Sequence, residues 1–374
     1  MYPHTTGRKT MYSYYDGLLN ISNQNKERIH IVIGQWDFSM DYARHGAVLI
    51  TSILENTRNP VTVHIFHNEE VGLKNPDSYH NNLEKYSKIA DKYSTEIQYH
   101  TINLPDWIYS DKRKRFQTLT PGALFRLYIP DVLVSIDRVI YLDCDMVVTT
   151  DLGKIWSHPI DNKAIAACRD ASSAAFVFKK YGKTYTKLGI KEENYFNSGF
   201  LIMDLTRIRE LNYLPDKGLE FLYEHTDDVE CLDQDALNYL FKDDVFYLDA
   251  KYNIGTRVLR SYSVEYQNQL DKQNYQDCVL HYYGQTKPWR VYLGKIDLPY
   301  WYYLSLTPWN ETYAQFVQNM LDAFPSDVDD AVYNKYPVLL RSEGWRIGLK
   351  NMFVPAIILL KYYWSAFWKI VLKQ

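Results

Sequence analysis

The stretch RVIYLDCDMVV, residues 138–148, decides the fold and places two carboxylates at one point of it. Residues 139–142 are β-branched, aromatic or aliphatic, which is typical of a buried strand in a largely parallel sheet. If the strand continues, Asp143 and Asp145 point to one face and Cys144 to the other. Two like charges on one face repel unless a positive charge lies between them, so the stretch predicts a divalent cation. Taken alone, the two aspartates could equally be turn-forming residues after a strand.

Strand-like segments alternate with helix-like segments on both sides of this stretch. Before it, IHIVIG, VTVHIF and EIQYHTI flank helical regions around residues 44–56 and 81–93, and Thr120 and Pro121 begin a further helix. After it, AIAACRD, YFNSGFLIMDL, DVFYLDAKYN and CVLHYYG are apolar segments with Asp, Asn or His at or near an end. This order predicts an α/β fold: a Rossmann-like, mixed, mostly parallel sheet with helices on both faces. A ligand site is expected beyond the carboxyl ends of its strands.

The composition is that of a packed globular protein. Of 374 residues, 46% are hydrophobic and 16% aromatic, and the 34 tyrosines offer many rings for stacking on sugars or bases. The formal net charge of -3 is not the positive charge that nucleic-acid binding usually requires, so nucleic acid is not a predicted partner. The four cysteines lack any C-x-x-C spacing, so a reducing, cytoplasmic location is expected.

Composition divides the chain into four parts. Residues 1–28 form a polar leader without the apolar segment of a secretory signal. Residues 29–300 are expected to form one catalytic domain, and residues 301–340 a helical, partly acidic connection. Residues 341–374 form a basic and aromatic tail.

The tail has the pattern of an amphipathic helix. Lys361 interrupts an apolar run that is too short to span a bilayer. On a helical projection, Phe353, Trp364 and Phe367 gather on one face, and Lys369 lies on the opposite face. Basic charge beside aromatic rings predicts peripheral contact with anionic lipid, here at the inner face of the membrane. The alternative is a terminal helix docked on the protein core or on a partner subunit, so an oligomer remains open.

Four motifs occur in order: YLDCDMVV (141–148), YFNSGFLIMDL (195–205), LDQDALNYLF (232–241) and HYYGQTKPW (281–289). Together they resemble glycosyltransferase family 8, the retaining sugar-nucleotide enzymes that include bacterial lipooligosaccharide galactosyltransferases and glycogenin. The resemblance covers about residues 120–290. It implies the nucleotide-sugar transferase fold called GT-A and a UDP-sugar donor. It also implies a glycan, glycoprotein or glycolipid acceptor.

The resemblance implies that Asp143, Asp145 and His281 hold Mn²⁺, with Mg²⁺ as the alternative. An oxygen-rich set with one nitrogen suits Mn²⁺ better than a closed zinc site. In the same family motif, Lys287 would place a charge on the donor phosphates, and Gly284 would allow close approach of the backbone. For isolated residues the alternatives are a half-buried structural histidine and a solvated surface lysine.

The resemblance also assigns residues to the donor sugar. Arg126 would contact the sugar and phosphate, although it could instead interact with a helix C-terminus. Asp233 would accept hydrogen bonds from sugar hydroxyls, and Gln234 would lie beside the anomeric carbon with Asp235 as the next carboxylate. Without the family, Asp233 would cap a helix and Asp235 would favour its first turn. The further donor-binding candidates are Gly34, Asp37, Cys144, Asp170 and Asn197.

The chain departs from the family at the end of the first strand. The family has a small residue followed by two acids, whose first Asp reads uracil, whereas this chain has GQWD at residues 34–37. Gln35 and Trp36 occupy the region of the acidic pair. Trp36 could stack on the base or pack under the loop, so the metal is better predicted than the base.

The sequence therefore predicts a retaining hexosyltransferase that moves glucose or galactose from a UDP-sugar with Mn²⁺ assistance. Retention could use a covalent intermediate on Asp235 or Gln234, or a same-face displacement assisted by the leaving phosphate. A glycoside hydrolase is disfavoured because Asp143 and Asp145 share a face instead of flanking a glycosidic bond. The alternatives are a glycogenin-like self-glycosylating primer and an inactive sugar-nucleotide or membrane-binding module.

Overall fold

The structure is a computed structural model that describes residues 26–110, 121–256, 275–284, 287–289 and 295–310. All of them belong to one compact unit of the chain, Met1–Phe316. Most of the predicted leader, residues 311–340 of the predicted connection and the whole predicted tail lie outside the described residues. Within the described part, no helix is long and apolar enough to cross a lipid bilayer.

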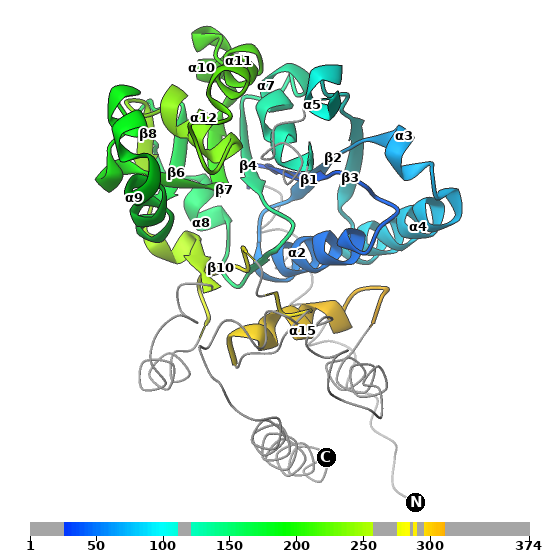
Figure 1. Cartoon of the computed structure of the whole chain (residues 1–374). Helices are drawn as coiled ribbons and strands as arrows, with labels where there is room; N and C mark the ends of the chain where they lie inside the picture. Colours follow the sequence, from blue (N-terminus) through cyan, green and yellow to red (C-terminus); the bar gives the residue numbers. More distant parts are fainter. Residues whose placement is uncertain (1–25, 111–120, 257–274, 285–286, 290–294, 311–374) are drawn as a thin grey trace, which may run out of the picture. The chain divides into compact units, whose positions relative to one another are not determined.

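A mixed sheet of seven strands forms the centre of this unit, in the spatial order β3-β2-β1-β4-β7-β6-β8 (Figure 1). The strands are β1 (Ile29–Gln35), β2 (Val61–His67), β3 (Glu96–Thr101), β4 (Arg138–Leu142), β6 (Ile165–Arg169), β7 (Phe196–Asp204) and β8 (Val245–Tyr247). Strand β7 is antiparallel to β4 and β6, and every other pairing in this sheet is parallel. The predicted mixed, mostly parallel sheet is confirmed.

Both faces of the central strands are buried, which explains their nearly continuous apolar sequences. On β4, Ile140 and Leu142 enter one hydrophobic cluster, and Val139 and Tyr141 enter the other. This alternation follows from the two-residue period of a strand. Each face therefore needs its own layer of helices.

The first face is covered by α2 (Tyr42–Asn56), α4 (Pro76–Tyr93) and α8 (Gly153–Trp156). Helix α4 begins at Pro76, earlier than the prediction near residue 81. Its start is marked by capping: the Asn75 side chain accepts a hydrogen bond from the Ser78 N–H, and Pro76 occupies the first turn. The first turn carries few apolar residues, so the apolar pattern alone placed the start too late.

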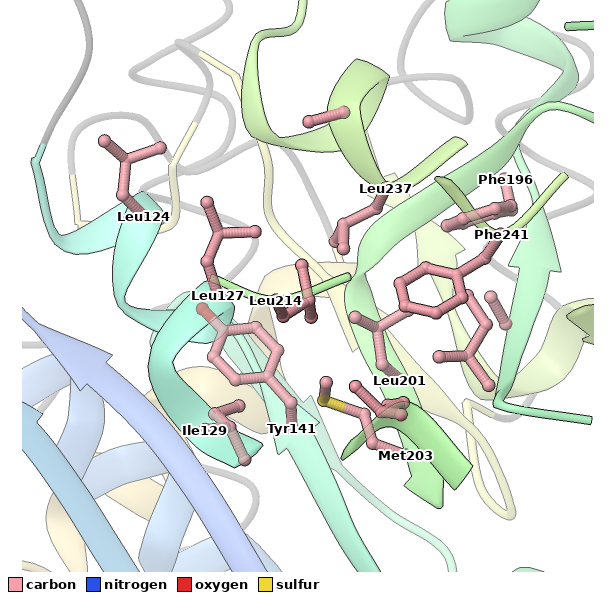
Figure 2. Packing of buried hydrophobic residues seen from close by; sticks show 14 of the residues in the cluster. Leu124, Leu127, Ile129, Tyr141, Phe196, Leu201, Met203, Leu214, Leu237 and Phe241 are labelled. Atoms are coloured by element: carbon pink, nitrogen blue, oxygen red, sulfur yellow. The ribbon is translucent and has the colours of Figure 1, made fainter. Parts of the chain in front are cut away.

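The second face is covered by helices that come from residues 106–240. They are α5 (Asp106–Ser110), the 3₁₀ helix η1 (Pro121–Tyr128), α7 (Ile129–Val132), α9 (Ala171–Lys187), α10 (Leu205–Leu211), α11 (Asp216–His225) and α12 (Asp233–Leu240). Figure 2 shows Leu127 of η1 and Leu237 of α12 near Tyr141 of β4 and Leu201 of β7. The helix predicted from Pro121 is thus a 3₁₀ helix followed by one α-turn.

A smaller sheet in the order β5-β10-β9 stands beside the large one. Its strands are β5 (Met146–Val148), β9 (Ile254–Gly255) and β10 (Val279–His281), and α15 (Leu298–Ser305) packs with it. Strand β10 is antiparallel to β5, with His281 opposite Met146. This pairing brings His281 next to the residue that follows Asp145. The remaining short helices are α3 (Glu69–Gly72), η2 (Glu192–Asn194), η3 (Ala250–Tyr252) and η4 (Lys295–Asp297).

The strand order creates a switch point at the carboxyl ends of β1 and β4. From β1 the chain adds β2 and β3 on one side, and it then returns to place β4 on the other side. In open α/β sheets, ligands bind in the crevice at such a point. Asp143 follows β4 directly, so the switch point contains the first predicted metal ligand.

Candidate functional site

Residues Asp143–Asp145 form a turn between the two sheets. Strand β4 ends at Leu142 and β5 begins at Met146, so the prediction that both carboxylates extend a strand is wrong. The Asp143 N–H donates to the Gly199 carbonyl at 2.9 Å, and the Tyr282 N–H donates to the Asp145 carbonyl at 2.9 Å. The turn is therefore held from both sides.

The Cys144 side chain is not at the surface of this turn. It is buried in the apolar cluster beside α2, and its thiol donates to the Gly34 carbonyl at 3.1 Å. Burial raises the pKa of the thiol well above its usual range. The two aspartates thus face one way and the cysteine the other, which leaves Cys144 as a packing contact to the end of β1.

Asp143, Asp145 and His281 come together as predicted for a metal site. Each offers one ligand atom, and these atoms lie within 4.8 Å of one another. The His281 Nε2 atom is 3.2 Å from Asp145 Oδ1 and 3.7 Å from Asp143 Oδ2. Two carboxylate oxygens and one imidazole nitrogen match the ligands of Mn²⁺, and carboxylate oxygens also suit Mg²⁺.

Two features show that this set fits a cation. Asp145 Oδ1 is a buried oxygen without a hydrogen-bond partner among the described residues, which is costly unless something positive approaches it. The second feature is Gly199, where a Cβ would lie 2.4 Å from His281 Cε1 and 2.7 Å from Asp143 Oδ2. Only glycine leaves room between the ligands at this position.

Lys287 binds the other oxygen of Asp145. Lys287 is 6% exposed, and its ammonium group donates to Asp145 Oδ2. Burial alone would raise the pKa of Asp145, but the charge of Lys287 holds it well below its usual range. Asp145 therefore remains an anion next to the predicted diphosphate position.

The loop that carries Lys287 is anchored by aromatic packing. The Trp289 ring stacks on His45 of α2, with the ring centroids 3.6 Å apart and the planes at 18°. Gly284 has a φ of 81°, a left-handed conformation that side chains disfavour. The backbone conformation at residue 284 therefore favours glycine.

Arg126 joins three parts of the site. Its guanidinium group donates to Asp143 Oδ1 at 2.7 Å and to the carbonyl and hydroxyl oxygens of Ser198 at 2.6 and 2.8 Å. It also lies 3.4 Å from Asp233 Oδ2 and stacks over the Tyr141 ring. Arg126 also lies in the last turn of η1 and donates to the Ala123 carbonyl at 2.9 Å, so the expected interaction with a helix C-terminus is present beside these contacts.

Helix α12 presents Asp233 and Gln234 to the start of β7. Asp233 Oδ2 accepts from the Ser198 hydroxyl at 3.3 Å, and Gln234 Oε1 accepts from the Ser198 N–H at 3.1 Å. The alternative role of Asp233 as a helix cap is wrong, because the cap position is Leu232, at a φ of 31°. Burial raises the pKa of Asp233 although the nearby Arg126 lowers it.

The Asp235 side chain points away from Ser198, toward the loop before α12. It is fully buried, and its oxygens accept hydrogen bonds from the Tyr195 hydroxyl at 2.5 Å and from the backbone N–H groups of Glu230 and Cys231. Burial raises the pKa of Asp235 to about 6 although these hydrogen bonds lower it. Its contacts hold the loop before α12, and they are not shared with the metal ligands.

Asp170 and Asn197 form a pair that connects to the metal ligands through Asn253. Asp170 caps α9 by accepting from the Ser173 N–H and also accepts from Asn197 Nδ2 at 2.9 Å. Asn253 Nδ2 donates to Asn197 Oδ1 at 2.8 Å, and Asn253 Oδ1 lies 2.9 Å from His281 Nδ1. The predicted sugar contacts thus share one network with a predicted metal ligand.

The candidates at the end of β1 occupy different places. A Cβ on Gly34 would lie 2.9 Å from the Gly122 carbonyl, so glycine allows β1 to approach η1. Asp37 accepts hydrogen bonds from the N–H and hydroxyl of Ser39 in the turn before α2. Gln35 points inward to Tyr86, and Trp36 lines an open cavity of about 530 Å³ at the carboxyl ends of β1, β2 and β3.

Four contributors to the site were not among the predicted residues: Ser198, Gly199, Asn253 and Tyr141, whose hydroxyl donates to Asp143 Oδ1 at 2.8 Å. Ser198 and Gly199 lie inside the FNSG motif next to Asn197, so the motif itself contained the signal. Asn253 ends the segment DVFYLDAKYN, whose terminal polar residue matched the pattern of the other strand ends. Its hydrogen-bond partners come from other parts of the chain, so its role could be identified only from the tertiary structure.

Comparison with known proteins agrees with this geometry. The family model described as "Glycosyl transferase family 8" matches residues 36–292. General stress protein A of Bacillus subtilis is 28% identical over 76% of this chain and 96% of that protein. Lipopolysaccharide 1,2-glucosyltransferase of Escherichia coli is 26% identical over 61% of this chain and 66% of that protein.

The fold is also found in solved structures. The galactosyltransferase LgtC, crystallised with donor and acceptor sugar analogs, aligns with a TM-score of 0.56 and 20% identity over 82% of this chain and all of that one. At this identity the likeness shows the fold alone, which is the predicted GT-A fold. Because the family model spans more than half of the residues, the chain belongs to glycosyltransferase family 8.

Proposed function

We propose that this glycosyltransferase moves glucose or galactose from a UDP-sugar to a glycan, glycoprotein or lipid-linked acceptor, with retention at the anomeric carbon. The observation that carries the proposal is the convergence of Asp143, Asp145 and His281 at the switch point of the sheet, around a buried carboxylate oxygen without a partner. This arrangement supports Mn²⁺ or Mg²⁺ as the cofactor. When bound, the cation would neutralise the diphosphate as charge builds on the leaving group.

The surrounding side chains supply binding and orientation. Lys287 forms an ion pair with Asp145, and its ammonium group would also attract the donor phosphates. Arg126 holds Asp143 and the start of β7 in place through its hydrogen bonds. Asp233 contacts the start of β7 through Ser198, and Asp170 contacts it through Asn197. There Asp233, Asn197 and Asp170 would exchange hydrogen bonds with sugar hydroxyls.

The environment of Asp235 favours one of the two routes to retention. A nucleophilic carboxylate must reach the anomeric carbon, but both oxygens of Asp235 are occupied inside the protein. Gln234 Oε1 is also engaged, because it accepts from the Ser198 N–H at 3.1 Å. We therefore favour same-face displacement. In it, the acceptor hydroxyl oxygen bonds to the anomeric carbon, the bond to the UDP oxygen breaks, and the hydroxyl proton passes to the leaving phosphate.

The test is a screen of UDP-sugars with and without Mn²⁺, read as released UDP. We expect release from UDP-glucose or UDP-galactose that requires the metal. Asp145→Asn removes one negative charge from the ligands with little change of shape, so it should abolish metal-dependent release while leaving the thermal unfolding transition in place. Full turnover by this variant would contradict the metal assignment. Absence of metal-dependent release from every UDP-sugar would contradict the donor class.

A further inference from the structure

We infer that Asn253 is a positioning residue for His281, because its amide sets which imidazole nitrogen carries the proton and leaves Nε2 free to bind a cation. The inference rests on the proposed metal site. It follows from a series of hydrogen bonds in which each partner has a single possible role.

The series begins at a backbone group. The Gly199 N–H can only donate, and it lies 2.9 Å from Asn197 Oδ1, so that atom must be the amide oxygen. The other end of the same side chain agrees, because Asn197 Nδ2 lies 2.9 Å from Asp170 Oδ2, a carboxylate acceptor. The orientation of the Asn197 amide is therefore determined from both sides.

The orientation of Asn253 follows from that of Asn197. Since Asn197 Oδ1 is an acceptor, the Asn253 atom 2.8 Å away must be its NH₂ group. The Asn253 oxygen then faces His281 Nδ1 at 2.9 Å and accepts from it. His281 must therefore carry a proton on Nδ1.

This proton leaves the other nitrogen available to a cation. In the neutral imidazole with a proton on Nδ1, the lone pair is on Nε2, the atom 3.2 Å from Asp145 Oδ1. A cation placed between Nε2 and Asp145 Oδ1 could bind both atoms. A hydrogen bond from the second ring nitrogen commonly orients metal-binding histidines in this way.

The backbone holds Asn253 and His281 side by side. Asn253 immediately precedes β9, whose Gly255 is paired with His281 of β10. The Thr256 hydroxyl also donates to the His281 carbonyl at 3.2 Å. Because these contacts use backbone atoms or Thr256, a side-chain substitution at residue 253 leaves the strand pairing intact.

Two substitutions at residue 253 separate its hydrogen bonds. Asn253→Leu has a similar size and no polar atom, so the Nδ1 proton loses its acceptor. We expect it to weaken Mn²⁺ binding by about 10- to 100-fold, the range found when such outer partners are removed. Asn253→Asp keeps an acceptor for Nδ1 and loses the donor to Asn197, so its Mn²⁺ affinity should equal or exceed that of the wild type.

The experiment titrates the full chain with Mn²⁺ alone and follows the electron paramagnetic resonance signal of free Mn²⁺. Asn81→Leu, on the exposed side of α4, is the matched control and should bind as the wild type does. In the metal-free, ¹⁵N-histidine-labelled chain, the His281 signal is assigned by its loss in His281→Gln. It should report a proton on Nδ1 in the wild type and in Asn253→Asp, and a mixture of the two tautomers in Asn253→Leu.

The outcomes distinguish this inference from the proposed function. A wild-type His281 protonated on Nε2, or an Asn253→Leu chain that binds Mn²⁺ as tightly as the wild type, overturns the role of Asn253. If the wild type and Asp145→Asn bind Mn²⁺ equally, the proposed metal site fails. In that case the tautomer measurement still decides the role of Asn253.

Discussion

Gln234 and Asp235 are neighbours in sequence but serve different parts of the structure. Successive helix residues point about 100° apart, so α12 directs Gln234 to Ser198 and Asp235 to the loop at residues 230–231. Both were predicted as catalytic from one motif. A motif gives the order of residues, whereas the direction of each side chain depends on where the helix begins, and α12 begins at Asp233.

Gln234→Ala should lower the rate of transfer more than it weakens UDP binding, because the proposed position of Gln234 is at the reacting carbon. The change also leaves the buried Ser198 N–H without an acceptor, which should reduce the free energy of unfolding by about 1 to 3 kcal/mol. Turnover, UDP affinity and urea unfolding measure the three effects. Gln234→Glu, which keeps an acceptor, is the comparison for stability. An equal loss of turnover and UDP affinity would assign Gln234 a structural role.

The reversed direction of β7 builds much of the site. Because β7 is antiparallel to β4, its first residues lie at the carboxyl end of β4, with Leu142 opposite Phe200. Asn197, Ser198 and Gly199 therefore meet the metal ligands, while Asp204 lies at the far edge. The alternation of strands and helices predicts the sheet but gives no direction for a single strand, so the contacts of Ser198 and Gly199 with the metal ligands and their partners were not predicted.

Gly199→Ala should prevent metal binding. The new methyl group would overlap His281, which is 2% exposed, and Asp143, which Arg126 and Tyr141 already hold. We expect loss of metal-dependent UDP release and a decrease of about 1 to 3 kcal/mol in the free energy of unfolding, as for other overpacked sites. Mn²⁺ titration and urea unfolding measure these effects.

Gly182→Ala on α9 is the matched control. The nearest atom to its Cβ is Phe178 Cδ1 at 3.8 Å, so the methyl group fits. Alanine should keep activity and stabilise the helix by up to about 1 kcal/mol. If Gly199→Ala behaved like this control, the close packing around the metal ligands would be refuted.

A row of three histidines joins β1, β2 and β3. His30 Nδ1 lies 3.0 Å from His64 Nε2, and His64 Nδ1 lies 3.1 Å from His100 Nε2. Burial, together with the nearby charges of His100 and His30, lowers the pKa of His64 to about 3. Burial is also the main cause that lowers the pKa of His30 and His100.

These pKa values predict a loss of stability in acid. Between about pH 6.5 and pH 3, the unfolded chain binds a proton at His64 that the folded chain does not. The free energy of unfolding is therefore not reduced by His64 above pH 6.5. It decreases as the pH falls below this value, by up to about 1.4 kcal/mol per pH unit for His64. His64→Gln should reduce this slope in urea unfolding between pH 7.5 and pH 5. His80→Gln, exposed on α4, should leave it unchanged, and equal slopes in both variants would refute the role of His64.

The site forms where the seven-stranded sheet and the three-stranded sheet meet. The large sheet supplies Asp143 and the start of β7, and the small sheet supplies His281 and Asn253. The motifs predicted the metal ligands because two of the motifs contain them, YLDCDMVV with Asp143 and Asp145 and HYYGQTKPW with His281. They did not predict Asn253, because its role comes from contacts to Asn197 and His281, which are 56 and 28 residues away in sequence.

Residues 342–374 lie outside the described part of the chain. The catalytic motifs end at Trp289, so deletion of these residues should preserve activity on a soluble acceptor. We propose that the tail holds the protein at the inner face of the membrane. The full-length chain should then co-sediment with anionic vesicles at low salt, and the shortened chain should not.

The expected affinity combines two terms with different salt dependence. Burial of rings such as Trp364 and Trp368 is insensitive to salt, whereas Lys350, Lys361 and Lys373 each add about 1 kcal/mol near an anionic surface and lose it as salt rises. Co-sedimentation should therefore weaken at high salt without vanishing. If the full-length chain stays in the supernatant at low salt, or if the shortened chain unfolds, the tail is a packing or assembly element. Its aromatic face would then be covered by protein instead of lipid.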